Sequence, residues 1–146
     1  MSRRAPLALL AGLLIAGCGS AAPSLRAFRA SATTICSTAE LKSAAIAVPS
    51  KPAGEAAFLR RGVALLRPEL VRLRKLRAPA SVADVYSTAL TAFGGKLNAL
   101  ERTLSGLQSG TDPILSIKGL ERRVAPLEAS EDGAWQALEV PACLNR

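Results

Sequence analysis

Residues 55–76 read EAAFLRRGVALLRPELVRLRKL, and this stretch decides the fold class. Its apolar side chains recur in steps of four, three, four and three, at Leu59, Val63, Leu66, Leu70 and Leu73. Because an α-helix has 3.6 residues per turn, this spacing places all five on one face. The stretch therefore predicts an amphipathic helix whose apolar seam packs against other helices. Pro68 lies inside it and lacks a backbone donor, which predicts a kink near Ala64.

The rest of the chain repeats the helical period three more times. We expect further helices over 25–47, 82–108 and 113–140, separated by short loops rich in proline and glycine. Ser81 and Asp84 suggest a capping box for the third helix, Gly110 ends it, and Asp112-Pro113 begins the fourth. Four helices with short connections predict an all-α fold, a four-helix up-down antiparallel bundle.

Two features should interrupt this regularity. Gly94-Gly95 lies inside the third helix, at a cost of roughly 1 kcal/mol per glycine. The pair either lets a neighbouring helix approach closely or forms a notch for a ligand. Pro126 and Gly133 predict that the fourth helix bends or divides into two pieces.

The first 24 residues have the pattern of an export signal. Arg3 and Arg4 precede an uncharged, largely apolar segment that ends in Leu14-Ile15-Ala16-Gly17-Cys18. That ending resembles the bacterial lipobox, which implies a diacylglyceryl group on the Cys18 thiol and cleavage after Gly17. The resemblance divides the chain into a signal peptide (1–17), a lipidated cysteine with its tether (18–24) and a helical bundle domain (25–146). An ordinary signal peptide with a chance cysteine is the alternative.

The lipobox also predicts where the protein resides. The apolar segment is shorter than the roughly 20 residues that a helix needs to cross a bilayer, so we do not expect a membrane-spanning anchor. The expected location is extracytoplasmic, with the protein anchored by lipid to the bacterial cell membrane. In that compartment the two remaining cysteines, Cys36 and Cys143, are expected to form one disulfide rather than two free thiols. The bond would close a loop of about 108 residues, worth about 4–5 kcal/mol in the chain-entropy model.

Positive charge is concentrated in the second helix. The chain has 19 Lys and Arg residues against 11 Asp and Glu, and residues 60–77 contain seven of the basic ones with a single acid, Glu69. On a helical wheel six of the seven fall on the arc away from the apolar seam: Arg60, Arg61, Arg67, Arg72, Arg74 and Lys75. We expect this arc to make any contact with anionic lipid or cell-wall polymer. A solvated face without a partner is the alternative.

Catalysis and nucleic-acid binding are not supported by the residues present. The chain has no histidine, the commonest general base, and no nucleophile motif, phosphate loop or clustered metal ligands. The acids Glu101, Glu121, Glu128, Glu131 and Asp132 are expected to be solvated. Aromatic residues that could stack on bases are nearly absent from the basic stretch. We therefore expect no enzyme, metal, cofactor or nucleic acid, and we expect the lone Trp135 to pack near the tail that carries the disulfide.

A wider resemblance covers most of the chain after the signal. The lipobox, a cysteine in the first helix, Leu-Arg-Ala-Pro at 76–79 and Ala-Leu-x-x-x-Ala-Cys at 137–143 are similar to small exported helical lipoproteins of GC-rich actinobacteria. The resemblance supports the bundle and its disulfide and implies no activity. We expect a non-catalytic, membrane-anchored binding or structural module of the cell envelope that is a monomer. The alternative is a carrier that holds a small apolar ligand within the bundle.

Overall fold

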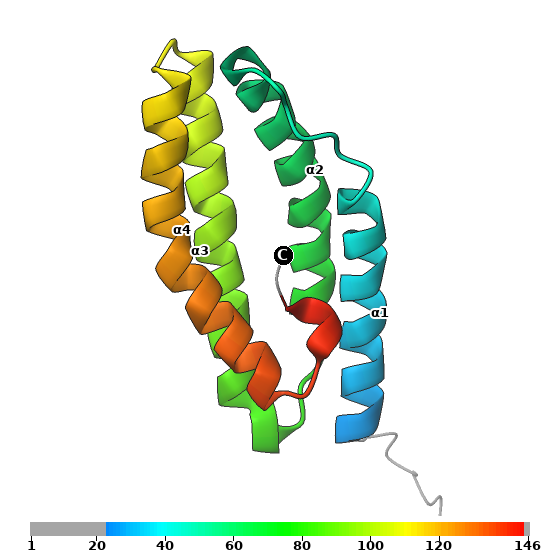
Figure 1. Ribbon diagram of the computed structural model, residues 1–146. Coiled ribbons are helices and arrows are strands. Elements are labelled where there is room, and N and C mark those ends of the chain that lie inside the picture. The colour runs from blue at the N-terminus through cyan, green and yellow to red at the C-terminus, as the bar shows by residue number, and fades with distance from the viewer. Residues whose placement is uncertain (1–22, 145–146) are drawn as a thin grey trace, which may run out of the picture.

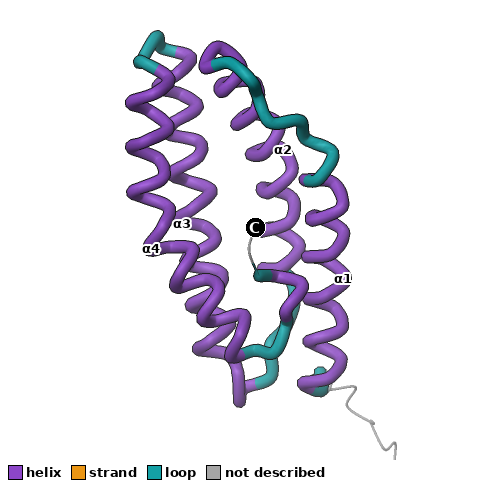
Figure 2. The backbone as a smooth tube through the Cα atoms, viewed as in Figure 1, coloured by secondary structure: helices purple, strands orange, loops and turns teal. Residues whose placement is uncertain are grey.

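The computed structural model describes residues 23–144 and confirms an all-α bundle with one disulfide. The four helices run alternately up and down, with short connections at the two ends of the bundle (Figure 1). The described part of the chain contains no strand (Figure 2). The helices are α1 (Leu25–Ser43), α2 (Glu55–Arg74), α3 (Ala83–Gln108) and α4 (Pro113–Ala137). Residues 1–22, and with them Cys18 and the predicted signal, lie outside the described residues.

Each helix packs against the next one along the chain, and the C-terminal tail completes the bundle. After α4 the chain turns back, and its 3-10 turn Pro141–Cys143 packs against both α1 and α4 (Figure 1). The fourth helix is therefore tied to the first through this tail. All buried core residues of the described chain lie between Phe28 and Cys143.

The seam that predicts α2 is buried as expected. Leu59, Val63, Leu70 and Leu73 are buried, and Leu66 packs at the edge of the core. The larger part of the core surrounds the disulfide and contains residues from all four helices and the tail. A smaller part, at the other end of α2, joins Leu59, Ala99, Leu120 and Val124.

The helix boundaries agree with the sequence where a specific cap is present. Asp112 accepts a hydrogen bond from the Leu115 amide at 2.9 Å, with Pro113 in the first turn of α4, as predicted. Gly110 has φ 88° and follows the last turn of α3, where the Thr111 amide donates to the Gly106 carbonyl at 3.0 Å.

Three boundary predictions are wrong. The fourth helix ends at Ala137 instead of residue 140, because the chain turns at Glu139. The first helix ends at Ser43 instead of continuing to residue 47, and the chain then turns through hydrogen bonds from Ala45 and Ile46 to the last helical carbonyls. Ser81 does not cap α3; it lies in a 3-10 turn over Ala80–Val82, and the residue before α3 makes no side-chain cap. Because the first helix ends early, the connection between α1 and α2 is longer than expected.

The internal prolines and glycines do not divide the helices. α2 is continuous through Pro68, and α4 is continuous through Pro126, although its second half leans toward the tail (Figure 1). A Cβ placed on Gly94 would lie 3.1 Å from Arg74 Nη2, and one placed on Gly95 would lie 3.2 Å from a Leu127 methyl group. The glycine pair thus lets α2 and α4 approach α3 from two sides, the first of the two roles considered from the sequence.

The turn after α4 fixes the direction of the tail. Glu139 has φ 55°, and the Val140 amide donates to the Trp135 carbonyl at 3.1 Å, which closes the helix in the left-handed conformation that usually favours glycine. Arg29 of α1 holds this turn, because its Nε donates to the Leu138 carbonyl at 2.8 Å and its Nη1 lies 2.7 Å from the Glu139 carboxylate. The tail is consequently directed back along α1.

Candidate functional site

The six predicted basic residues of α2 form one exposed face. Arg60 and Arg61 lie in the first half of the helix, Arg67 at its middle, and the rest at its C-terminal end; all six are exposed. We call this set the basic face: Arg60, Arg61, Arg67, Arg72, Arg74 and Lys75. It is built by the period of the helix, because the apolar seam of the same helix is turned into the core.

Three members of the basic face also contact the bundle. Arg67 Nη2 lies 2.7 Å from the Glu101 carboxylate of α3, and Arg61 donates to the Ala47 carbonyl at 3.4 Å. Arg74 extends over Gly94 of α3. Arg60, Arg67 and Arg74, which share one edge of the helix, are therefore not equivalent, since two of them rest on α3.

A groove lies beside the basic face, between α2 from Phe58 to Glu69, the end of α1 and the tail. It encloses about 290 Å³ and is lined mainly by apolar side chains. The lining residues are Ala39, Glu40, Ser43, Ile46, Val48, Phe58, Gly62, Leu65, Leu66, Glu69, Ala142 and Leu144. Pockets that hold small ligands are typically of this size or larger and mostly apolar.

Glu69, the single acid in the basic stretch, is not part of the exposed basic face. Its side chain is fully buried and lines the groove, between the apolar seam and α1. The spacing of Glu69, three residues after Leu66 and four before Leu73, places it beside the apolar seam and could have indicated its burial. A count of charges alone does not show that Glu69 is buried.

The prediction that Glu131 is solvated is wrong. It is fully buried between α4 and α3, with Lys96 Nζ 2.8 Å from one carboxylate oxygen and Trp135 Nε1 donating to the other at 3.3 Å. Burial raises the pKa of Glu131 above its ordinary value, and the positive charge of Lys96 opposes that rise. Lys96 is itself only 4 % exposed. This pair is a structural element of the core that the charge pattern of the sequence did not predict.

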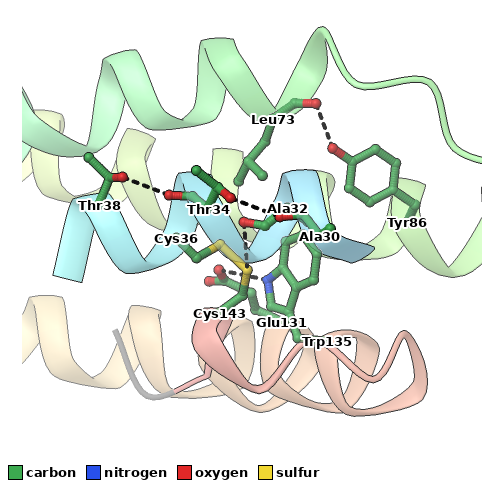
Figure 3. Close-up of a disulfide and its surroundings, with 10 residues drawn as sticks. All are labelled: Ala30, Ala32, Thr34, Cys36, Thr38, Leu73, Tyr86, Glu131, Trp135 and Cys143. Atoms are coloured by element: carbon green, nitrogen blue, oxygen red, sulfur yellow. Dashed lines mark hydrogen bonds between the residues drawn. A yellow bond between two sulfur atoms is a disulfide. The ribbon is translucent and has the colours of Figure 1, made fainter. Parts of the chain in front are cut away.

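The disulfide is formed as predicted. Cys36 of α1 and Cys143 of the tail are bonded, with their Cα atoms 5.1 Å apart and both residues fully buried. Trp135 lies beside them, as Figure 3 shows, which confirms the position predicted for it. Its indole ring packs edge-on against Tyr86, whose ring meets Phe28 in the same way. Tyr86 donates a hydrogen bond to the Leu73 carbonyl, and burial raises the pKa of its phenol.

The described residues offer no group of metal ligands and no helix suited to a bilayer. Among residues 23–144, no three His, Cys, Asp or Glu side chains converge on one point. None of the helices in that range combines the length and apolar character that crossing a membrane requires. Comparison with protein-family models, with curated proteins and with solved structures found no match for this chain.

Proposed function

We propose that this protein is an exported lipoprotein, anchored to the bacterial cell membrane through Cys18, and that its bundle is a non-catalytic binding module for anionic surfaces of the cell envelope. The observation that supports the contact is the basic face, six exposed cations on a single helix. The lipobox-like ending at Cys18 supports the anchor.

The basic face suits an anionic lipid or wall polymer because its charge is presented on a rigid helix. Each Lys or Arg close to an anionic membrane contributes about 1 kcal/mol of attraction, and the contributions of several cations add. The attraction falls off over a Debye length, which is about 10 Å at 0.1 M salt and about 3 Å at 1 M. Binding should therefore be strong at low salt and reversible by added salt.

Neutralising part of the basic face should abolish this binding without unfolding the bundle. The soluble chain from residue 19 onward, with its disulfide formed, is expected to co-sediment with phosphatidylglycerol vesicles at low salt and to be released near 1 M salt. Replacing Arg60, Arg72 and Lys75 with Gln should weaken binding of this untethered chain by about 100-fold, because no anchor orients the bundle and the whole basic face can touch the surface. All three are exposed, so helicity should be unchanged.

The matched control removes the same charge elsewhere. Arg102, Lys118 and Arg122 are exposed on α3 and α4, away from the basic face. Their replacement with Gln should leave most of the affinity intact. Equal losses in the two triple variants would show that net charge alone causes binding, which would contradict a specific role for α2. A wild-type chain that ignores both anionic vesicles and wall polymer at low salt would refute the contact altogether.

The anchor is tested separately by the variant Cys18→Ala. Without the thiol no lipid can be attached, so the variant should leave the membrane fraction in high-salt washes, whereas the wild type should stay in it until detergent is added. High salt removes the contribution of the basic face, which would otherwise obscure the result. A variant that is retained as firmly as the wild type, although its mass shows that residues 1–17 have been removed, would contradict lipidation at Cys18.

The groove favours a second candidate, a carrier of a small apolar ligand. Its lining is largely aliphatic and includes Phe58, Leu65 and Leu66 from α2. Native mass spectrometry of protein purified from its own host would then show a stoichiometric bound lipid or metabolite. Gly62 lines the groove, and a Cβ on it meets no neighbour within 4 Å. Gly62→Leu should therefore fold normally, and its side chain should narrow the groove and release such a ligand. Protein that carries no ligand would exclude this candidate.

A further inference from the structure

α1 begins at the same end of the bundle at which α2 finishes. α1 begins at Leu25, directly after the predicted tether, and α2 runs antiparallel to it, so that residues 72–77 return to that end (Figure 1). We call it the tether end, and the opposite end, which holds the loop between α1 and α2 and the start of α4, the distal end.

The length of the tether restricts which end can reach a membrane. Six residues, 19–24, separate Cys18 from the first helical residue and span at most about 20 Å. α1 alone, with 19 residues, is about 28 Å long. If the bundle stood with its distal end on the bilayer, the start of α1 would be farther from the surface than the tether allows. Only the tether end and the flanks are within reach.

The tether end carries several exposed cations that are close enough to a membrane at that end to interact with its headgroups. Its exposed basic residues are Arg26, Arg72, Arg74, Lys75 and Arg77. The acids at this end are Asp84, which is exposed, Glu139, which pairs with Arg29, and Asp132, which is partly exposed and lies five residues before the end of α4. Arg60 is fourteen residues before Arg74, which corresponds to about 21 Å along the helix, or two Debye lengths at 0.1 M salt. When the tether end touches the membrane, the distal part of the basic face contributes little.

Apolar side chains are distributed in the opposite way. Four of the five large hydrophobic residues that are exposed in the described chain lie at the distal end: Leu41, Val48, Ile114 and Leu115. Only Val71 is near the tether end, and it is half exposed. Contact at the tether end would therefore be electrostatic, without deep insertion of apolar groups, and should be reversed by salt.

From these positions we infer that the anchored bundle stands upright on the membrane, with Arg26 and the C-terminal end of α2 on anionic lipid headgroups and the distal end directed away from the bilayer. The inference rests on the proposed function, because it assumes both the anchor at Cys18 and contact with an anionic surface. It adds that the partner of this end is the membrane rather than wall polymer, and that the apolar distal end is left free.

The five lysines of the chain allow the orientation to be measured. Lys75 lies at the tether end, Lys42, Lys51 and Lys118 lie at the distal end, and Lys96 is buried. The chain from Cys18 onward, with its disulfide formed, is coupled through the Cys18 thiol to a maleimide lipid with a short linker. Vesicles are made of phosphatidylcholine alone or with phosphatidylglycerol. The rate of acetylation of each lysine is then measured by mass spectrometry.

On phosphatidylglycerol vesicles we expect acetylation of Lys75 to slow by about fivefold or more relative to phosphatidylcholine, and that of the three distal lysines to change less than about twofold. High salt should restore the rate at Lys75. Arg26→Gln with Arg72→Gln should also restore it, whereas Arg60→Gln with Arg61→Gln, a matched pair from the distal half of α2, should not.

The outcomes separate the orientation from the proposed function. Protection of Lys42, Lys51 or Lys118 on anionic vesicles would overturn the upright orientation while keeping the anionic contact. Unchanged rates at all lysines would overturn both. Protection of Lys75 by soluble anionic wall polymer, with none on phosphatidylglycerol vesicles, would overturn the membrane as the partner of this end and keep the basic face as a binding site.

Discussion

Replacing Lys96 with methionine is expected to lower the free energy of unfolding by about 3–5 kcal/mol, because Glu131 would remain buried without its partner. The carboxylate is fully buried and lies 2.8 Å from the Lys96 ammonium group. The Trp135 indole also donates a hydrogen bond to this carboxylate, at the longer distance of 3.3 Å. The loss is large beside the 5–15 kcal/mol that typically stabilises a domain. Urea unfolding followed by circular dichroism measures it.

The destabilisation should depend on pH in a definite direction. Burial already raises the pKa of Glu131, and removing Lys96 raises it further. A carboxyl whose folded-state pKa is raised stabilises the fold most at low pH, and that contribution is lost as pH rises from its ordinary pKa through the raised value. Lys96→Met should therefore be least harmful in acid, where Glu131 is neutral, and most harmful at neutral pH.

Two controls distinguish a buried ion pair from a simple change in packing. Adding Glu131→Leu to Lys96→Met removes both charges and should recover most of the lost stability. Disrupting the exposed Arg67–Glu101 pair with Arg67→Ala should cost less than about 1 kcal/mol. If Lys96→Met cost no more than Arg67→Ala, the pair would have no role in the core.

Removing the disulfide is the second change for which we expect a large effect. The bond joins residues 107 apart, and in the chain-entropy model its loss costs about 4–5 kcal/mol. Cys36→Ala with Cys143→Ala should accordingly shift the urea midpoint to much lower concentration. The tail should be the first segment to separate, because this bond and the Arg29 contacts fix it against α1.

Reduction of the wild type provides the matching measurement. Unfolding with dithiothreitol present should coincide with unfolding of the double alanine variant, and dithiothreitol should not affect that variant. Hydrogen exchange should show the earliest loss of protection at residues 138–144. A reduced protein as stable as the oxidised one would show that the bond does not constrain the unfolded chain.

The fold could be predicted because its main signals are periodic. The apolar steps from Leu59 to Leu73 define a helical face independently of the rest of the chain, and similar steps mark the other helices. The pairing of Cys36 with Cys143 was predicted because these two of the three cysteines remain once Cys18 is assigned to the predicted lipid, in a chain expected to be exported. Asp112 and Gly110 mark helix boundaries with chemistry that acts locally, and both were confirmed.

The predictions that were wrong include features that tertiary contacts determine: a helix cap and the burial of two charged side chains. Residue 81 is a serine followed by an acid three positions later, yet the chain forms a 3-10 turn there and the cap is not made. Lys96 and Glu131 were missed because a charge pattern does not show which face of a helix is covered. A signal existed, since Lys96 is three residues after Phe93 and Glu131 is four residues before Trp135, on the buried faces of both helices. Two opposite charges on facing seams can indicate a buried pair.

The basic face was located in the sequence by the same helical period, and its six residues are all exposed. What the sequence could not provide was their relation to the rest of the molecule. The contact of Arg67 with Glu101, the position of Arg74 over Gly94 and the return of residues 72–77 to the tether end all depend on how α2 packs against its neighbours.

The intact mass of the protein extracted from its host's membranes tests the central claim most directly. A lipid-anchored, disulfide-locked bundle predicts a chain that begins at Cys18, carries the mass of a diacylglyceryl group, with or without a further acyl chain, and gains two hydrogens on reduction as Cys36–Cys143 opens. A chain that retains residues 1–17, or one that begins elsewhere and has no lipid on Cys18, would contradict the account.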